Sequence, residues 1–218
     1  MCDIAEILPA LIVISLRSAR RLLGQLGVLD MAYDASIVTR FDDETKALNG
    51  DYWLEPMQDG TPMLIRELAA RDRERDLVFF EGLGADTPHF RFLASFSERE
   101  DTHDQLMDVS LPNRMAYIAL AYEGKELKEI GKARYGAFEG DAHCEFAVAV
   151  SEQWQRKGVA SALMQHLMDT AKRQGFKKIS SMDASNNQHM DLLAKSLGFT
   201  CRNNDEHGSK IFHEFVLQ

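Results

Sequence analysis

Residues 148–176 read VAVSEQWQRKGVASALMQHLMDTAKRQGF. The stretch begins with the apolar residues of a strand, passes through a polar loop, and continues at helical spacing from Gly158 to Gln174, with Gly175 as the stop signal. The predicted helix presents one apolar stripe to a sheet. That stripe consists of Val159, Ala162, Leu163, Leu167 and Ala171. A strand, a loop and an amphipathic helix in this order predict an α/β domain.

The junction between this loop and the helix has the chemistry of a phosphate site. A helix N-terminus directs unpaired backbone N–H groups and the positive end of the helix dipole to one place. Gly158 and Ala160 are small enough to let a pyrophosphate approach those groups, and Arg156 and Lys157 add positive charge. The pattern GxxxxGK[ST] is absent, and residues 82–84 (GLG) lack the third glycine of a dinucleotide site. Nucleoside-triphosphate and NAD chemistry therefore lose support.

Regular elements flank this stretch on both sides. Strands are predicted at PMLIREL (62–68), RMAYIALAYEG (114–124), ELKEIGKARYGAF (126–138), AHCEFAVAV (142–150), KKISSMDA (177–184) and KIFHEFVL (210–217), and helices at ARDRERDLVFFEGLG (70–84) and NNQHMDLLAKSLG (186–198). The pattern predicts an α/β fold with a mixed sheet (α+β), in which a meander precedes a β-α-β-α-β tail. We expect one domain over residues 50–218 and a partly helical or loosely ordered N-terminal extension over residues 1–49.

The composition narrows the classes of partner and compartment. The chain has 218 residues, 45% of them hydrophobic and 27% charged, which is typical of a soluble globular protein. Its net charge of -9 repels phosphates and anionic lipids, so we expect no nucleic-acid partner. Three cysteines without a CxxC pattern favour a reducing cytoplasm, and no pair of histidines forms HxxxH, so we expect no metal.

The first 30 residues differ in composition from the rest of the chain. The apolar run over residues 4–16 is shorter than the about 20 residues of a membrane span, and acidic residues precede it where a secretory signal carries basic ones. We therefore expect no membrane span. Two interpretations stay open: an upstream extension with Met31 as the true start, or an amphipathic helix that docks on a partner or membrane surface.

The loop and helix start resemble the acetyl-CoA-binding signature of the GNAT superfamily, [QR]-x-x-G-x-[GA], at Gln155, Gly158 and Ala160. A second signature, an asparagine followed by an apolar helix that ends in LGF, appears at Asn187 and residues 197–199. The resemblance covers about residues 50–218 and implies the GNAT acyl-CoA N-acyltransferase fold with acetyl-CoA as co-substrate. It implies contact of acetyl-CoA with Val148, Val150, Gln155, Arg156, Lys157, Gly158, Val159, Ala160, Ser161 and Asn187.

Within the superfamily the chain is most similar to the GNAT domain of bacterial Pat-type protein lysine acetyltransferases. The segments that carry this likeness are RFL (91–93), MAYIAL (115–120), IGKARY (130–135) and EFAVAV (145–150). The likeness implies a protein lysine side chain as the amine acceptor. Two alternative functions stay open: acetylation of a small-molecule amine, and acetyl-CoA sensing without catalysis. A homodimer is also open.

Glu145 is the candidate catalytic residue. Strand alternation places it with His143, Ala147 and Ala149, on the face opposite Cys144 and Phe146. In the resembling family the glutamate at this place is the general base that an amine of pKa about 10.4 requires. The alternative is an edge carboxylate in a structural salt bridge.

The remaining roles also follow from the resemblance. A backbone N–H near Val148 would stabilise the oxyanion. The tyrosine that many GNAT enzymes use to protonate the departing thiolate is Ala194 here. Coenzyme A would then leave as the thiolate, or Tyr135 or a water would supply the proton. Asn187 either contacts the pantetheine or caps its helix.

Overall fold

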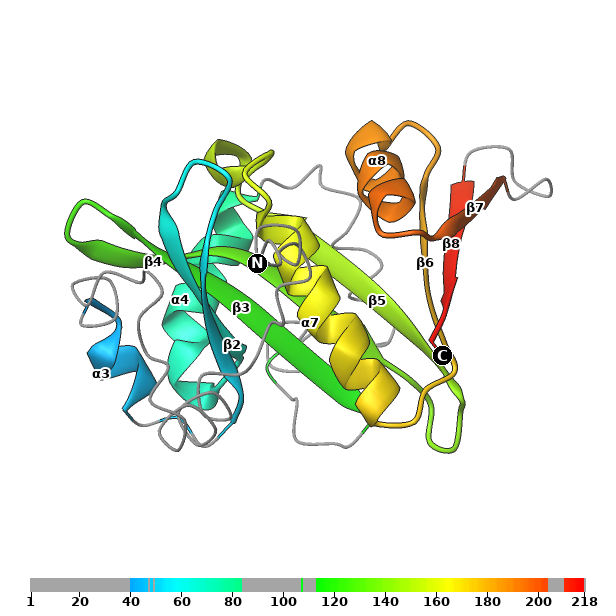
Figure 1. The fold of residues 1–218 in the computed structure, drawn as a ribbon, viewed down its shortest axis with the longest axis horizontal. Helices are drawn as coiled ribbons and strands as arrows, with labels where there is room; N and C mark the ends of the chain where they lie inside the picture. Colours follow the sequence, from blue (N-terminus) through cyan, green and yellow to red (C-terminus); the bar gives the residue numbers. More distant parts are fainter. Residues whose placement is uncertain are drawn as a thin grey trace, which may run out of the picture.

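One mixed sheet of eight strands runs through the described part of the chain, which in this computed structural model comprises residues 40–46, 48, 50–83, 107, 113–203 and 210–217 (Figure 1). The strands are β1 (Tyr52–Pro56), β2 (Pro62–Glu67), β3 (Arg114–Glu123), β4 (Glu126–Gly136), β5 (His143–Val150), β6 (Lys178–Ala184), β7 (Thr200–Asn203) and β8 (Lys210–Val216). Their order in the sheet is β1-β2-β3-β4-β5-β6-β8-β7. All neighbours are antiparallel except β5 and β6, which are parallel.

Three of the described helices follow strands in the order that the sequence predicts, and a fourth, short helix precedes β1. The described helices are α3 (Asp42–Thr45), α4 (Arg73–Gly82), α7 (Val159–Arg173) and α8 (Gln188–Ser196), with short 3-10 turns η2 (Ala70–Asp72) and η3 (Glu152–Trp154). The predicted meander is confirmed as β3, β4 and β5, and the predicted α/β mixed-sheet fold is confirmed.

Two short strands were missed by the sequence prediction. β1 contains Glu55 and Pro56 and lies at one edge of the sheet, and β7 has four residues at the other edge. Neither strand has an apolar pattern of its own. β1 is held by pairing with the longer strand β2, and β7 by pairing with the longer strand β8. The predicted β-α-β-α-β tail is therefore wrong in its last step, because it ends in a β7–β8 hairpin.

Some sequence-based predictions fall outside the described residues. They concern residues 1–30 with the alternative start at Met31, and the RFL segment at 91–93. Just before residue 50, Phe41 and Leu48 are buried against β2 and β3. The domain boundary at residue 50 stays a prediction.

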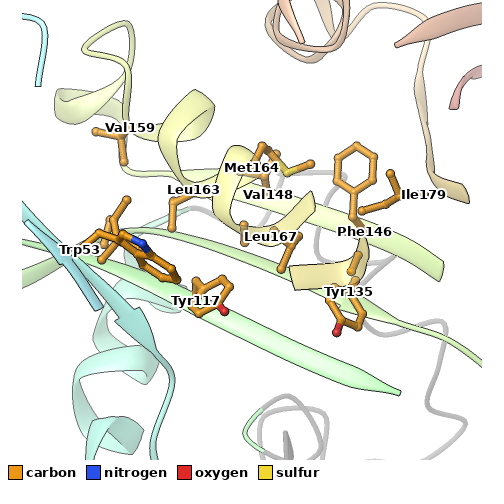
Figure 2. Packing of buried hydrophobic residues seen from close by; sticks show 14 of the residues in the cluster. Trp53, Tyr117, Tyr135, Phe146, Val148, Val159, Leu163, Met164, Leu167 and Ile179 are labelled. Carbon is orange, nitrogen blue, oxygen red and sulfur yellow. The ribbon is translucent and has the colours of Figure 1, made fainter. Parts of the chain in front are cut away.

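Helix α7 packs on β3, β4 and β5 and builds the larger core (Figure 2). Its buried stripe contains Val159, Leu163, Leu167 and Ala171, as predicted, whereas Ala162 is only half-buried. Gly131 in β4 allows the close approach, because a Cβ there would lie 3.0 Å from Cγ1 of Val159. This packing fixes the start of α7 beside the end of β5.

The opposite face of the sheet carries charged groups beneath α4. Lys132 of β4 lies one residue from Gly131 and therefore points away from α7, where its Nζ is 2.5 Å from Oδ1 of Asp76. The Arg66 guanidinium contacts Asp72 and Glu44, each at 2.7 Å, and Arg66 is fully buried. These ion pairs attach η2 and α4 to β2 and β4.

Candidate active site

The loop after β5 ends at a glycine with a left-handed backbone. Gly158 is the N-cap of α7 and has φ of 89°, a left-handed backbone conformation that residues with a Cβ rarely adopt. The first helical hydrogen bond runs from the N–H of Ala162 to the carbonyl of Gly158 at 3.1 Å. Among the described residues no side chain caps the helix, so the N–H groups of Val159, Ala160 and Ser161 remain directed outward. This geometry fits an anionic ligand such as a pyrophosphate.

The two basic residues of the loop differ in their surroundings. Arg156 is exposed and has φ of 58°. The Lys157 ammonium lies 3.0 Å from Oδ2 of Asp59 and 4.9 Å from the ring centre of Trp154. The backbone N–H of Gln58 also donates to the carbonyl of Lys157 at 3.0 Å. The turn between β1 and β2 therefore holds the loop in place.

This turn is a part of the site that the sequence prediction missed. A backbone hydrogen bond from Thr61, assisted by the Lys157 ammonium, lowers the pKa of Asp59 to about 2. Asp59 is therefore ionised at neutral pH and forms an ion pair with Lys157. No local pattern pointed to Gln58 or Asp59, because they meet the loop only through the pairing of β1 and β2.

Strands β5 and β6 separate at Glu145. They pair only over His143–Glu145 and Lys178–Ser180, although β6 continues to Ala184 in its pairing with β8. β5 likewise continues to Val150 in its pairing with β4. Among the described residues, no strand pairs with the β6 side of β5 beyond Glu145. A ligand with amide groups could extend the sheet there.

The backbone of Val148 points into this separation. The N–H of Ser151 donates to the carbonyl of Ile130 in β4 at 3.0 Å. Because alternate residues of an antiparallel strand point to opposite neighbours, Ala149 and Ala147 also face β4, whereas Val148 and Val150 face the β6 side. The side chain of Gln155 donates to the Val150 carbonyl at 3.2 Å. Gln155 therefore ties the loop to the strand.

The Glu145 side chain lies on the face of the sheet opposite α7. Its neighbours Cys144 and Phe146 belong to the core beneath that helix, whereas Glu145 is half-buried. Glu145 is the last residue of β5 that pairs with β6, opposite Ser180. Ser180 in turn lies 2.7 Å from Nε2 of His143, so polar groups surround the point where the strands separate.

The second signature lies on α8, beside β6 (Figure 1). The side-chain oxygen of Asn187 accepts a hydrogen bond from the N–H of Met190 at 3.2 Å, so Asn187 caps this helix. Ala194 is fully buried on the same helix. Tyr135 is also fully buried, its hydroxyl has no hydrogen-bond partner within the described ranges, and burial raises its pKa. This position does not suit a proton donor to a departing thiolate.

Comparison with known proteins identifies the family. Residues 80–199 match the family model described as Acetyltransferase (GNAT) family. Acetyltransferase PA5475 of Pseudomonas aeruginosa is 38% identical over 172 residues, which cover 78% of this chain and 92% of that protein. The chain therefore belongs to the GNAT acetyltransferase family. It is an N-acetyltransferase that uses acetyl-CoA as its co-substrate.

Solved structures show the same fold at low sequence identity. The GNAT domain of S. lividans PAT superposes with a TM-score of 0.63 at 20% identity, over 85% of this chain and 100% of that chain. The structure of yncA, a putative acetyltransferase from Salmonella typhimurium with acetyl-CoA, superposes with a TM-score of 0.53 at 22% identity, over 72% and 94%. These likenesses confirm the predicted GNAT fold.

Within the described ranges, no helix is both long and apolar enough to cross a bilayer.

Proposed function

We propose that this enzyme acetylates protein lysine side chains, with Glu145 as the general base. The observation that carries the proposal is the separation of β5 and β6 at Glu145, beside the unpaired edge that contains Val148. A thioester bound along that edge would have its carbonyl near the Val148 N–H. The carboxylate of Glu145 would then stand at the end of the same edge, on the face opposite α7.

The residues of the loop and of α7 suit the rest of the acetyl-CoA molecule. The pyrophosphate would accept hydrogen bonds from the N–H groups of Val159, Ala160 and Ser161, and Arg156 and Lys157 would supply positive charge. The pantetheine amides would pair with the backbone of Val148 and Val150 as an added strand does. Asn187, at the start of α8, borders the same separation from the other side and would contact the pantetheine.

The chemistry requires a base because the acceptor amine has a pKa of about 10.4 and is protonated at neutral pH. Glu145 removes one proton from the ammonium group, directly or through a water molecule. The amine lone pair then forms a bond to the thioester carbon, and the Val148 N–H donates to the resulting oxyanion. The carbon–sulfur bond breaks as the intermediate collapses. Coenzyme A leaves as a thiolate, whose conjugate thiol has a pKa of about 8.5. The nitrogen releases its remaining extra proton to water, from which the thiolate is protonated, and Glu145 returns its own proton to solvent.

A protein lysine is the acceptor that the sequence supports best. Three segments shared with Pat-type domains form most of β3, the second half of β4 and most of β5; they are residues 115–120, 130–135 and 145–150. These strands hold Glu145 and the unpaired edge. The fold likeness to the GNAT domain of S. lividans PAT, which covers the whole of that domain, agrees with this choice.

The test is thiol release from acetyl-CoA with a deacetylated bacterial lysate and, separately, with a panel of small amines. We expect release that depends on the lysate and that falls by about 100-fold or more in Glu145→Gln. Glu152→Gln is the matched control, because Glu152 is an exposed carboxylate in η3, just beyond β5. Thiol release only with a small amine would contradict a protein acceptor and indicate that the enzyme acetylates a metabolite. Acetyl-CoA binding without release on any acceptor would indicate a sensor.

A further inference from the structure

Three potential metal ligands meet on the α8 side of the sheet, away from Glu145. Asp191 of α8, Cys201 of β7 and His213 of β8 bring a carboxylate, a thiol and an imidazole together, with their ligand atoms all within 4.8 Å of one another. Sγ of Cys201 lies 3.2 Å from Nδ1 of His213, because the two residues are register partners in the β7–β8 hairpin.

We propose that Asp191, Cys201 and His213 bind a zinc ion, with water as the fourth ligand. Zinc takes sulfur at about 2.3 Å and nitrogen or oxygen at about 2.0 Å in a tetrahedron, which places neighbouring ligand atoms about 3.5 Å apart. The Sγ–Nδ1 distance of 3.2 Å is close to this spacing, and the carboxylate oxygen of Asp191, within 4.8 Å of both atoms, would move toward the ion. A thiolate and an imidazole favour zinc over the hard ions magnesium and calcium, which prefer oxygen ligands.

The surroundings of His213 support a metal ligand. His213 is almost fully buried, and its second ring nitrogen, Nε2, lies 4.0 Å from Oδ2 of Asp183. Histidines that bind metals commonly direct their second nitrogen to a carboxylate, which fixes the ring. Asp183 is itself held by the Ser181 hydroxyl at 3.1 Å and by the Asn187 amide at 3.3 Å.

The ion would fasten α8 to the β7–β8 hairpin. Asp191 pairs with Lys195 through Oδ2 at 2.7 Å, so its other oxygen, Oδ1, would bind the ion without breaking this pair. Asn187, which caps the same helix, is linked to His213 through Asp183. Zinc would therefore stabilise the helix that borders the separation of β5 and β6. The sequence predicted no metal because it contains no pair of histidines at HxxxH spacing. Asp191, Cys201 and His213 are not close in sequence and meet only through the fold.

Cobalt titration of the metal-free full chain tests the proposal. We expect one Co²⁺ per chain with a thiolate-to-cobalt charge-transfer band, displacement of the band by Zn²⁺, and no effect of Mg²⁺. Cys201→Ser and His213→Gln should abolish the band, whereas His189→Gln, which changes an exposed histidine on the same helix, should retain it. Asp183→Asn should weaken zinc binding by roughly 10-fold to 100-fold. Absence of the band in the unmodified chain would overturn the proposal.

A second measurement needs no substitution. Zinc should protect Cys201 from alkylation, as read by peptide mass spectrometry, while alkylation of the buried Cys144 would report unfolding of the chain. Equal alkylation of Cys201 with and without zinc would contradict the site. Neither readout depends on acetyl-CoA or on an acceptor, so the zinc proposal and the proposed acetylation reaction succeed or fail separately.

Discussion

Replacing Arg66 with methionine should destabilise the fold strongly and leave the affinity for acetyl-CoA unchanged. Nη1 and Nη2 of Arg66 each lie 2.7 Å from one carboxylate oxygen of Asp72, and Nη2 lies 2.7 Å from Oε2 of Glu44. Arg66 is fully buried and Asp72 is 1% exposed. Methionine fills a similar volume without charge, so the variant leaves Asp72 as a buried carboxylate without its main partner.

The expected loss follows from this burial. Removing one member of a buried ion pair costs about 3–5 kcal/mol in the free energy of unfolding. Arg75 remains 3.1 Å from Oδ1 of Asp72 and still offsets part of the buried negative charge. We therefore expect Arg66→Met to lower the unfolding free energy by about 3 kcal/mol. Urea unfolding at neutral pH measures the loss. The control is Arg71→Met, whose 40% exposed side chain pairs with Glu44 at 3.3 Å and should cost less than about 1 kcal/mol. Equal losses in the two variants would refute this reasoning.

The same ion pair has a defined pH dependence. Burial alone would raise the pKa of Asp72, but hydrogen bonds and charge from Arg66 outweigh it, so the net pKa is lowered. A lowered pKa contributes stability above the unfolded value of about 3.9, and the contribution is lost as the pH falls through the folded pKa. The difference in unfolding free energy between the parent chain and Arg66→Met should therefore shrink below about pH 4. A constant difference down to acid unfolding would contradict this assignment.

Three further substitutions test the site and the core. Asp59→Asn frees Lys157, and calorimetry at low salt should show a several-fold higher affinity for acetyl-CoA; a lower affinity would contradict competition between Asp59 and the phosphates. Gly158→Ala places a Cβ at φ of 89° and should lower the unfolding free energy by about 1–2 kcal/mol in urea; an unchanged value would mean that the loop relaxes freely. Leu163→Ala removes a fully buried side chain and should cost about 2–5 kcal/mol, against less than about 0.5 for the exposed control Leu192→Ala; similar losses would contradict the packing of α7.

Periodicity predicted most of the fold. The meander and α7 carry long, regular apolar patterns, so their residues indicate both the element and its buried face. β1 and β7 are short edge strands whose conformation depends on the neighbouring strand, and no local pattern marks them. Alternation also placed Glu145 on the face opposite Phe146, where the structure has it.

The arrangement of the site was less accessible from the sequence. The separation of β5 and β6 depends on where two strands stop pairing, which their residues do not encode locally. The contact of Asp59 with Lys157 and the meeting of Cys201 with His213 are likewise tertiary. The complete burial of Tyr135 shows the same limit, because its strand pattern did not indicate how deeply the hydroxyl lies.

The most direct test of the central claim is the pH dependence of thiol release in Glu145→Gln, with a lysine peptide and saturating acetyl-CoA. If Glu145 is the base, the variant should be about 100-fold or more slower at neutral pH and should approach the parent rate as the pH rises toward the amine pKa of about 10.4, where the acceptor loses its proton unaided. An unchanged rate at neutral pH, or a defect of equal size at every pH, would contradict the role of Glu145 as the general base.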